Sequence, residues 1–176
     1  MTPLPTRNIE LKARDRDRVR SLAICNDIGA EPQGVLFQRD TYFYVPNGRL
    51  KLRQEEGARP HLIAYERLDR VEERESRYRI IEVDEPEELK AALSGFLGVK
   101  AVVTKERWLF LWERVRVHLD QVDGLGDFIE FEAVADADSD LSHEEAQVVS
   151  LRRAFEIDEA DLVAGSYADA VSTRVG

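Results

Sequence analysis

The strongest constraint on how this chain folds is a period-two alternation of charged and apolar residues that recurs in several separate segments. In residues 8–14, Asn8, Glu10 and Lys12 alternate with Ile9 and Leu11. Side chains point alternately to the two faces of a β-strand, so each segment predicts a strand with one charged and one apolar face. The same pattern occurs around Arg49, Lys51 and Arg53, around Lys105 and Arg107, around Arg116, His118 and Asp120, and around Glu130 and Glu132.

The order of the predicted elements indicates an internal duplication. Strands are expected near residues 8–14, 35–45, 48–54, 61–68, 75–83, 100–111, 113–121 and 127–135. One helix is expected between Asp15 or Asp17 and Gly29, and another between Pro86 and Gly98. The unit of one strand, one helix and three strands therefore occurs twice.

This order predicts an α+β fold, an eight-stranded antiparallel closed barrel built from a duplicated β-α-β-β-β unit with its helices packed outside. Hairpin-length connections favour antiparallel strands, and closure of the sheet removes its exposed edges. We expect a single domain over residues 1–176, with the barrel at about 8–135 and C-terminal helices at about 142–170.

Three local signals predict turns and helix ends. Asn47-Gly48 suits a tight hairpin turn. Ser142 and Glu145 have the spacing of a capping box, which predicts a helix from Ser142 to about residue 155. Asp158 is expected to cap a short helix that ends at Gly165.

The charge balance argues against a nucleic-acid duplex as partner. The chain has 35 acidic and 25 basic residues, a net charge of −10, whereas duplex binding depends on an excess of cations. Ten of the acids and only two arginines lie in residues 135–169, so the rest of the sequence is close to neutral.

A single cysteine, Cys25, excludes an intramolecular disulfide and a thiolate zinc cage, and it fits a core position in a reducing compartment. Met1–Arg7 lacks the apolar core of a secretory signal, and no apolar run is long enough to span a membrane. We therefore expect a cytoplasmic protein without a membrane partner, and a homodimer is left open. The three histidines are scattered, so a metal would sit on carboxylates.

Two interpretations of the charged strand faces remain open. A one-sided sheet exposes its charged face to water, whereas a closed barrel turns that face into a lumen. Solvated faces usually mix Ser, Thr, Gln and Lys, but these segments carry paired Arg and Lys on some strands and paired carboxylates on others. A magnesium-bound polyphosphate requires both sets, cations for the phosphate oxygens and carboxylates for the metal. This requirement favours the lumen.

Five short motifs follow one another along nearly the whole chain. They are residues 8–12 (NIELK), 38–43 (QRDTYF), 48–53 (GRLKLR), 105–107 (KER), and 118–120 (HLD) followed by 124–132 (GLGDFIEFE). In this order they resemble the CYTH family, the triphosphate tunnel metalloenzymes that include class IV adenylyl cyclases, thiamine triphosphatases and inorganic triphosphatases. Residues 8–12 are similar to its Glu-x-Glu-x-Lys signature, and residues 65–69 and 76–78 look most like the class IV cyclase branch. The resemblance implies an eight-stranded antiparallel tunnel.

The resemblance also implies roles for residues at matching positions. Glu10, Asp120, Glu130 and Glu132 would bind one or two Mg²⁺ or Mn²⁺ ions, and the expected catalytic residues are Glu10 and Lys12. The substrate-binding residues would be Lys12, Lys51, Arg53, Arg67, Arg79, Lys105, Arg107 and Arg116.

The implied function is metal-dependent hydrolysis of inorganic triphosphate or of a small organic triphosphate, with tripolyphosphate, ATP or thiamine triphosphate as the partner. Two alternatives stay open. A class IV-type adenylyl cyclase would use the ribose hydroxyl of ATP in place of water and release cyclic AMP and pyrophosphate. A binding module would recognise triphosphates or polyphosphates without turnover.

The chain departs from the family pattern at two positions. Asn8 stands where the family has a glutamate, so one negative charge is missing beside the metal. Tyr65-Glu66-Arg67 stands where many relatives place a lysine after the tyrosine, so either Arg67 takes that role or a phosphate contact is lost.

Several further residues carry expectations. Trp108 and Trp112 share one strand face and are expected to pack under a helix, and His118 is expected in the tunnel wall. Residues 165–169 resemble a tail of relatives and are expected over one tunnel mouth. Crowding of the acids at Glu130 and Glu132 predicts that removing one of these charges leaves the metal-free protein as stable or more stable.

Overall fold

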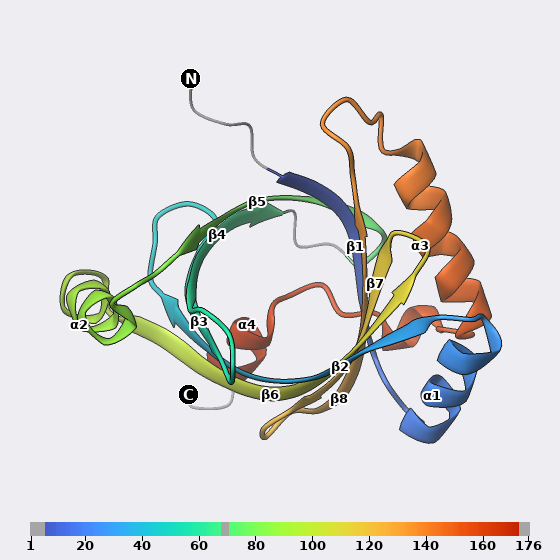
Figure 1. Cartoon of the computed structure of the whole chain (residues 1–176), viewed down its shortest axis with the longest axis horizontal. Coiled ribbons are helices and arrows are strands. Elements are labelled where there is room, and N and C mark those ends of the chain that lie inside the picture. The colour runs from blue at the N-terminus through green and yellow to red at the C-terminus, as the bar shows by residue number, and fades with distance from the viewer. Residues whose placement is uncertain (1–5, 68–70, 173–176) are drawn as a thin grey trace.

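The computed structural model of the chain describes residues 6–67 and 71–172. Eight strands close into an antiparallel barrel in the order β1-β5-β4-β3-β2-β6-β7-β8 (Figure 1). The elements are β1 (Thr6–Arg14), α1 (Arg18–Asp27), β2 (Glu31–Phe43), β3 (Arg49–Glu55), β4 (His61–Arg67), β5 (Arg74–Glu82), α2 (Pro86–Leu97), β6 (Val99–Trp112), β7 (Val115–Val122), β8 (Gly126–Val134), α3 (Ser142–Ala154), the 3₁₀ turn η1 (Glu159–Asp161) and α4 (Tyr167–Ser172). The predicted barrel and its duplicated element order are confirmed.

The predicted alternation decides which residues point into the barrel. On β1, Asn8, Glu10 and Lys12 line the interior cavity, while Ile9 and Leu11 belong to a core outside the barrel wall. The charged face is therefore the lumen, and the interpretation as a solvated sheet face is wrong.

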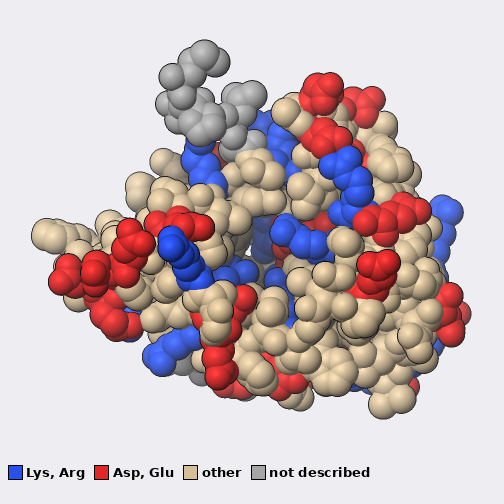
Figure 2. All heavy atoms as spheres, viewed as in Figure 1, with Lys and Arg blue, Asp and Glu red and all other residues tan. Residues whose placement is uncertain are grey.

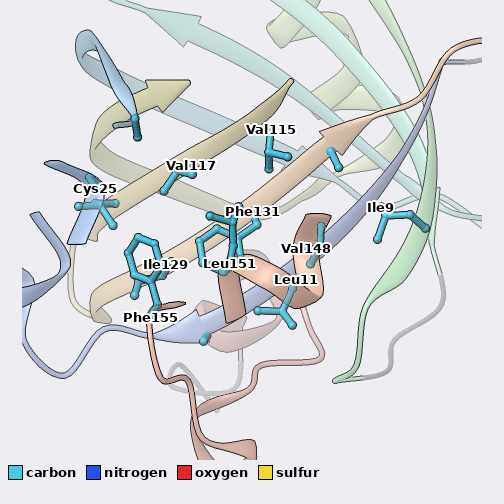
Figure 3. Packing of buried hydrophobic residues seen from close by; sticks show 14 residues of the cluster. Ile9, Leu11, Cys25, Val115, Val117, Ile129, Phe131, Val148, Leu151 and Phe155 are labelled. Atoms are coloured by element: carbon cyan, nitrogen blue, oxygen red, sulfur yellow. The ribbon is translucent and has the colours of Figure 1, made fainter. Parts of the chain in front are cut away.

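The main core lies between the outer face of β1, β7 and β8 and the helices α1 and α3 (Figure 3). Leu11, Val117 and Phe131 of the strands pack against Leu151 of α3 and Phe155 that follows it, all almost fully buried. The Phe131 and Phe155 rings meet edge to face with their centroids 5.2 Å apart. The outer core also contains Cys25 of α1, and Trp108 and Trp112 pack against its edge, as expected from their spacing. This packing fixes the wall that carries Glu10, Glu130 and Glu132.

The helix ends agree with the sequence in two cases and differ in a third. The side chain of Asp17 caps α1 by accepting a hydrogen bond from the Arg20 backbone N–H at 3.0 Å, and α2 begins at Pro86 and ends before Gly98. The capping box at Ser142 is wrong. Leu141 takes the N-cap position of α3 in the left-handed conformation, and Asp140 accepts hydrogen bonds from Ser142 instead.

The segment between α3 and the C-terminal end of the described chain also differs from expectation. In place of a helix up to Gly165, a single 3₁₀ turn is followed by an extended stretch beside β1, where Val163 N–H donates to the Lys12 carbonyl at 2.9 Å. The helix α4 then forms at Tyr167–Ser172, beyond Gly165, where the last helix was expected to end. The bond from Val163 and the bridge between Ala13 and Leu162 satisfy part of the backbone that a longer helix would have paired internally.

The β2–β3 hairpin is present, but five residues connect its strands instead of a two-residue turn. Gly48 in this connection has a φ of +64°, and a Cβ there would lie 2.8 Å from the Tyr65 carbonyl oxygen. Close approach to β4 therefore requires glycine.

No helix in the described part of the chain is long and apolar enough to cross a membrane. The expectations that concern residues 1–5 and residues 68 and 69 fall outside the described residues.

Candidate active site in the barrel lumen

A cavity of about 210 Å³ lies inside the barrel. In the space-filling view the molecule is hollowed over the barrel, and Lys and Arg atoms show within the opening (Figure 2). All eight strands and the C-terminal tail contribute to the lining, which consists of Asn8, Glu10, Lys12, Leu36, Gln38, Tyr42, Lys51, Arg53, Ile63, Tyr65, Arg67, Ser76, Tyr78, Ile80, Lys105, Arg107, Leu109, Arg116, His118, Glu130, Glu132, Ser166 and Tyr167.

The lumen is cationic although the protein is acidic. Seven lining residues are Lys or Arg and three are Glu, in a chain with a net charge of −10. Two further carboxylates, Asp40 and Asp120, contact these cations and are almost completely buried, yet the lining cations outnumber the five carboxylates together. Since charges in a secluded site are poorly screened, the lumen attracts polyanions.

Asp40 of β2 holds two of the lumen cations in place. Its carboxylate accepts two hydrogen bonds of 2.7 Å from the Arg53 guanidinium and one of 2.9 Å from the Lys51 ammonium. Burial alone would raise the pKa of Asp40, but Arg53 and Lys51 hold this pKa well below its usual value. Burial lowers the pKa of Lys51 to about 8, and neighbouring Arg53 adds to the effect.

Asp120 of β7 holds Arg107 in place in the same way. The two side chains form a bidentate pair with both distances at 2.7 Å, and the Tyr167 hydroxyl donates to Asp120 at 2.9 Å. The Lys105 ammonium lies between the two buried acids, 3.9 Å from Asp40 and 3.7 Å from Asp120. Burial is the main reason why the pKa of Lys105 falls well below its ordinary value.

The three lining glutamates lie on the adjacent strands β1 and β8, and each contacts a cation. Glu130 contacts Lys12 at 3.1 Å and Arg107 at 2.9 Å. Glu132 contacts Arg116 at 2.7 Å, and Glu10 accepts a hydrogen bond from Arg67. The strand register places Glu10 opposite Glu132 and Lys12 opposite Glu130.

One group of side chains has the spacing of a metal site. His118, Glu130 and Glu132 each offer a ligand atom within 4.8 Å of the others, and His118 Nδ1 lies 3.4 Å from Glu130 Oε2. Burial lowers the pKa of His118, which favours the neutral imidazole that a metal requires. Burial would raise the pKa values of both glutamates, but Lys12 holds that of Glu130 well below its usual value, and Arg116 is the main cause that lowers that of Glu132 to about 2. Both glutamates are therefore ionised at neutral pH.

Asn8 provides a further oxygen on the same wall. Its Oδ1 atom is buried, and the described chain supplies it with no hydrogen-bond partner. A buried acceptor without a donor is costly unless a cation or water satisfies it. Asn8 and Glu10 line the same cavity as the group of His118, Glu130 and Glu132, so the lumen offers further oxygen donors to a divalent cation.

The C-terminal tail enters the site from one end of the barrel. The Tyr167 ring lies under Lys12, whose ammonium is 3.9 Å from the ring centroid, and packs edge to face on Phe128. Asp169 accepts from Arg49 at 3.0 Å and from Lys100 at 2.6 Å, which ties α4 to β3 and β6. The expectation that residues 165–169 fold over a tunnel mouth agrees with these contacts.

The comparisons with known proteins agree with this geometry. The sequence profile of the CYTH domain matches residues 6–167. The chain belongs to the CYTH family. No curated protein sequence matches it closely enough to be reported.

Solved structures share this CYTH fold. The PH1012 protein of Pyrococcus horikoshii is 25% identical, with a TM-score of 0.83 over 92% of this chain and 98% of that one. A candidate adenylate cyclase of Vibrio parahaemolyticus is 20% identical, with a TM-score of 0.75 over 97% and 99%. A candidate adenylyl cyclase of Hippeastrum, whose description reports a dominant triphosphatase activity, is 15% identical, with a TM-score of 0.64 over 96% of each chain.

The CYTH lumen brings together most residues to which the sequence assigned a role. The predicted residues that line it are Glu10, Lys12, Lys51, Arg53, Arg67, Lys105, Arg107, Arg116, Glu130 and Glu132. Asp120 lies behind Arg107, and its oxygens face Arg107 and Tyr167, so its place in a metal site stays a prediction. Arg67 points inward to Glu10, which favours the option that it replaces the lysine of relatives.

The position of Arg79 differs from the predicted one. On β5 the side chains of Ser76, Tyr78 and Ile80 line the lumen, so Arg79 between them faces outward and is exposed. A shift of one residue in strand phase reverses every side chain, and the sequence does not fix the phase of β5. The predicted phosphate contact of Arg79 is therefore wrong.

Several site residues were missed from the sequence. Asp40 has the same strand phase as Gln38 and Tyr42, so alternation on β2 was a usable signal for it. Fully buried Arg74, 3.5 Å from Glu10, follows residues 68–70 and had no comparable signal. Tyr167 belongs to the tail that was expected over a tunnel mouth, but its hydrogen bond to Asp120, 47 positions away in the sequence, had no local signal.

Proposed function

We propose that the protein is a metal-dependent enzyme that hydrolyses a triphosphate inside the barrel. The observation that carries this proposal is the composition of the lumen, where seven cations surround a wall of three glutamates in an otherwise acidic protein. A general anion site would not need the glutamates, and a metal site alone would not need seven cations.

The phosphates are expected to bind between two groups of cations. Lys51 and Arg53 lie on β3, Lys105 and Arg107 lie on β6, and Asp40 and Asp120 hold the arginines from behind. Because the guanidinium groups are already oriented, less conformational entropy is lost when phosphate binds.

The glutamate wall is expected to bind the divalent ion. Glu10, Glu130 and Glu132 with His118 and Asn8 would hold Mg²⁺ or Mn²⁺, although Asn8 offers one negative charge fewer than the family pattern. When bound, such an ion neutralises phosphate charge and lowers the pKa of a water nucleophile.

Substrate binding requires an exchange of ionic partners. In the structure Lys12 and Arg107 contact Glu130, Arg116 contacts Glu132, and Arg67 contacts Glu10. When these carboxylates take up a cation, the Lys and Arg groups become available to phosphate oxygens. Metal and triphosphate are therefore expected to bind cooperatively. The metal would replace the Lys and Arg partners of the glutamates, and the triphosphate would bind the Lys and Arg groups that are released.

Lys12 is the proposed catalytic cation. Its ammonium lies between Glu130 and the Tyr167 ring, which places a donor at the meeting point of the glutamate wall and the phosphate cations. A buried ammonium in this position stabilises the negative charge that develops when a phosphoryl group is transferred to water. Glu10 acts with it by orienting Arg67 and by offering a carboxylate oxygen to the ion.

Product analysis tests the proposal and separates it from its alternatives. The purified protein is incubated with Mg²⁺ or Mn²⁺ and with tripolyphosphate, ATP or thiamine triphosphate in turn. We expect metal-dependent release of orthophosphate. Pyrophosphate with cyclic AMP would identify a cyclase, and tight binding without any product would identify a binding module.

A further inference from the structure

Four apolar side chains line one end of the charged lumen. They are Leu36, Ile63, Ile80 and Leu109. Ile80 is 53% exposed although it faces the lumen. Within residues 6–67 and 71–172, neither hydrophobic core cluster includes any of the four. Core packing therefore does not explain why these positions are apolar.

The four side chains form two walls. Ile63 on β4 is directly opposite Ile80 on β5 in the strand register. Leu36 on β2 is opposite Arg107, so it lies diagonally next to Leu109 on β6. In the order of the barrel, β3 separates the two pairs on one side and β7, β8 and β1 separate them on the other. The two apolar pairs therefore face each other across the lumen.

This end of the barrel lies away from the C-terminal tail. The Ile63–Ile80 pair is two residues from the start of β4 and from the end of β5, beside the start of β1. Tyr167 instead contacts Phe128 near the start of β8, which pairs with the end of β1. The remaining side of the apolar end is polar, with Asn8, Arg116 and Glu132 in the lining.

We infer that these four residues, the apolar collar, bind the organic group of the substrate, and that the substrate is a triphosphate ester whose organic group carries a flat aromatic ring. This inference rests on the proposed function. Two apolar walls with a polar third side match the two faces and the polar edge of such a ring. Free tripolyphosphate has no apolar surface and gains nothing from the collar.

Binding of uncleavable analogues tests the inference. The ligands are tripolyphosphate, methyl triphosphate and ATP, each with both bridging oxygens replaced by methylene groups, so that neither hydrolysis nor pyrophosphate release consumes them. Affinities are measured by calorimetry in Mg²⁺ for the wild type, Ile63→Ser, Ile80→Ser and Leu109→Ser. Each variant is expected to bind the ATP analogue about tenfold more weakly, the effect of uncovering one to two methylene groups. Affinity for the two analogues without a ring is expected to stay unchanged.

Ile81→Ser is the matched control. Ile81 is the next residue on β5, faces outward and is 57% exposed, so it should alter no affinity. Equal losses for all three ligands, or no loss for the ATP analogue, would overturn the collar. If tripolyphosphate binds the wild type and the ATP analogue does not, the collar fails while the proposed function stands. If no ligand binds the wild type, both fail. Melting temperatures check that each variant is folded.

Discussion

Two kinds of carboxylate surround the lumen, and they differ in whether another side chain separates them from the cavity. Asp40 and Asp120 sit behind arginines that shield them from the cavity, whereas Glu130 and Glu132 line the cavity themselves. The first pair holds the site in shape, and the second pair is available to a ligand. We call Asp40 and Asp120 the first layer, and Glu130 and Glu132 the second layer. Removing a carboxylate from the first layer is expected to reduce mainly the stability, whereas removing one from the second layer is expected to reduce mainly the activity.

The largest effect is expected for Asp120→Asn. The change leaves the buried Arg107 guanidinium without its bidentate partner, and breaking a buried ion pair in this way costs about 3–5 kcal/mol of unfolding free energy. Urea denaturation measures this loss. Asp136→Asn, which breaks an exposed pair with Arg114, is the control and should leave the midpoint unchanged. An unchanged midpoint for Asp120→Asn would remove the distinction between the two layers.

Acid pH tests the ionised state of the second layer. The pKa of Glu132 is about 2 in the folded protein against an ordinary value of 4.5, so the folded state binds this proton less readily than the unfolded state. The stabilisation is complete above pH 4.5 and is lost as the pH falls towards 2. The shift corresponds to at most about 3 kcal/mol. Denaturation curves across this range should show the loss, and Glu132→Gln should flatten it.

Glu130→Gln is expected to reduce metal-dependent turnover more than about 100-fold, since even residues that only support metal ligands account for factors of 10–100. Phosphate release measures the turnover, and calorimetry with Mn²⁺ measures the binding of the ion. Glu145→Gln on the exposed surface of α3 is the control. Full activity of Glu130→Gln would show that this carboxylate does not bind the ion.

The structure reverses one expectation about the same substitution. Crowding of acids predicted that losing a glutamate would leave the metal-free protein as stable or stabilise it. Glu130 instead lies against Lys12 and Arg107, and its depressed pKa means that the charged form is the favoured one. The Glu130→Gln variant should therefore unfold at a lower urea concentration than the wild type. Its midpoint should fall by less than that of Asp120→Asn, because Arg107 still has Asp120 as its ionic partner.

Lys51 allows a test of the cation set by proton uptake. With a pKa of about 8, Lys51 is about half neutral at pH 8, and a bound phosphate raises this pKa towards its ordinary value. Triphosphate binding at pH 8 should take up a fraction of a proton, and affinity should fall above this pH. Calorimetry in two buffers of different ionisation enthalpy measures the uptake. Lys51→Arg stays charged and should remove this contribution. Equal uptake in both proteins would place the titrating group elsewhere.

The smallest effect is expected for Asn8→Glu. The change restores the family pattern beside Glu10 and should raise Mn²⁺ affinity by about tenfold or less, with the largest gain in turnover at low Mg²⁺. A further acid raises like-charge repulsion, so stability should fall without metal and recover with it. Melting temperature and phosphate release across a metal titration measure both. If neither changes, Asn8 does not face the ion.

Much of the site could be predicted because alternation along a strand is a local property. Glu10 and Lys12 on β1, and Glu130 and Glu132 on β8, follow from the period of two once one face is known to be apolar. The same reasoning failed for Arg79, because on β5 the charged residues Arg77 and Arg79 face outward while Tyr78 and Ile80 line the lumen, the reverse of β1 and β8. The phase of β5 was decided by pairing with β1 and β4.

The sequence by itself determined the strands, their order along the chain, the charged face of most strands and the family, because these depend on neighbours one to four residues apart and on short motifs. Only the tertiary structure decided that Asp40 and Asp120 stand behind arginines, that Tyr167 reaches Asp120, and that four apolar residues gather at one end of the lumen. The register of the β2–β3 and β6–β7 hairpins sets Asp40 against Arg53 and Asp120 against Arg107, and α4 brings in Tyr167. The four apolar residues come from separate strands that closure of the barrel brings together. Closure is a collective property of the whole sheet, so no local pattern in the sequence encodes which side chains meet across it.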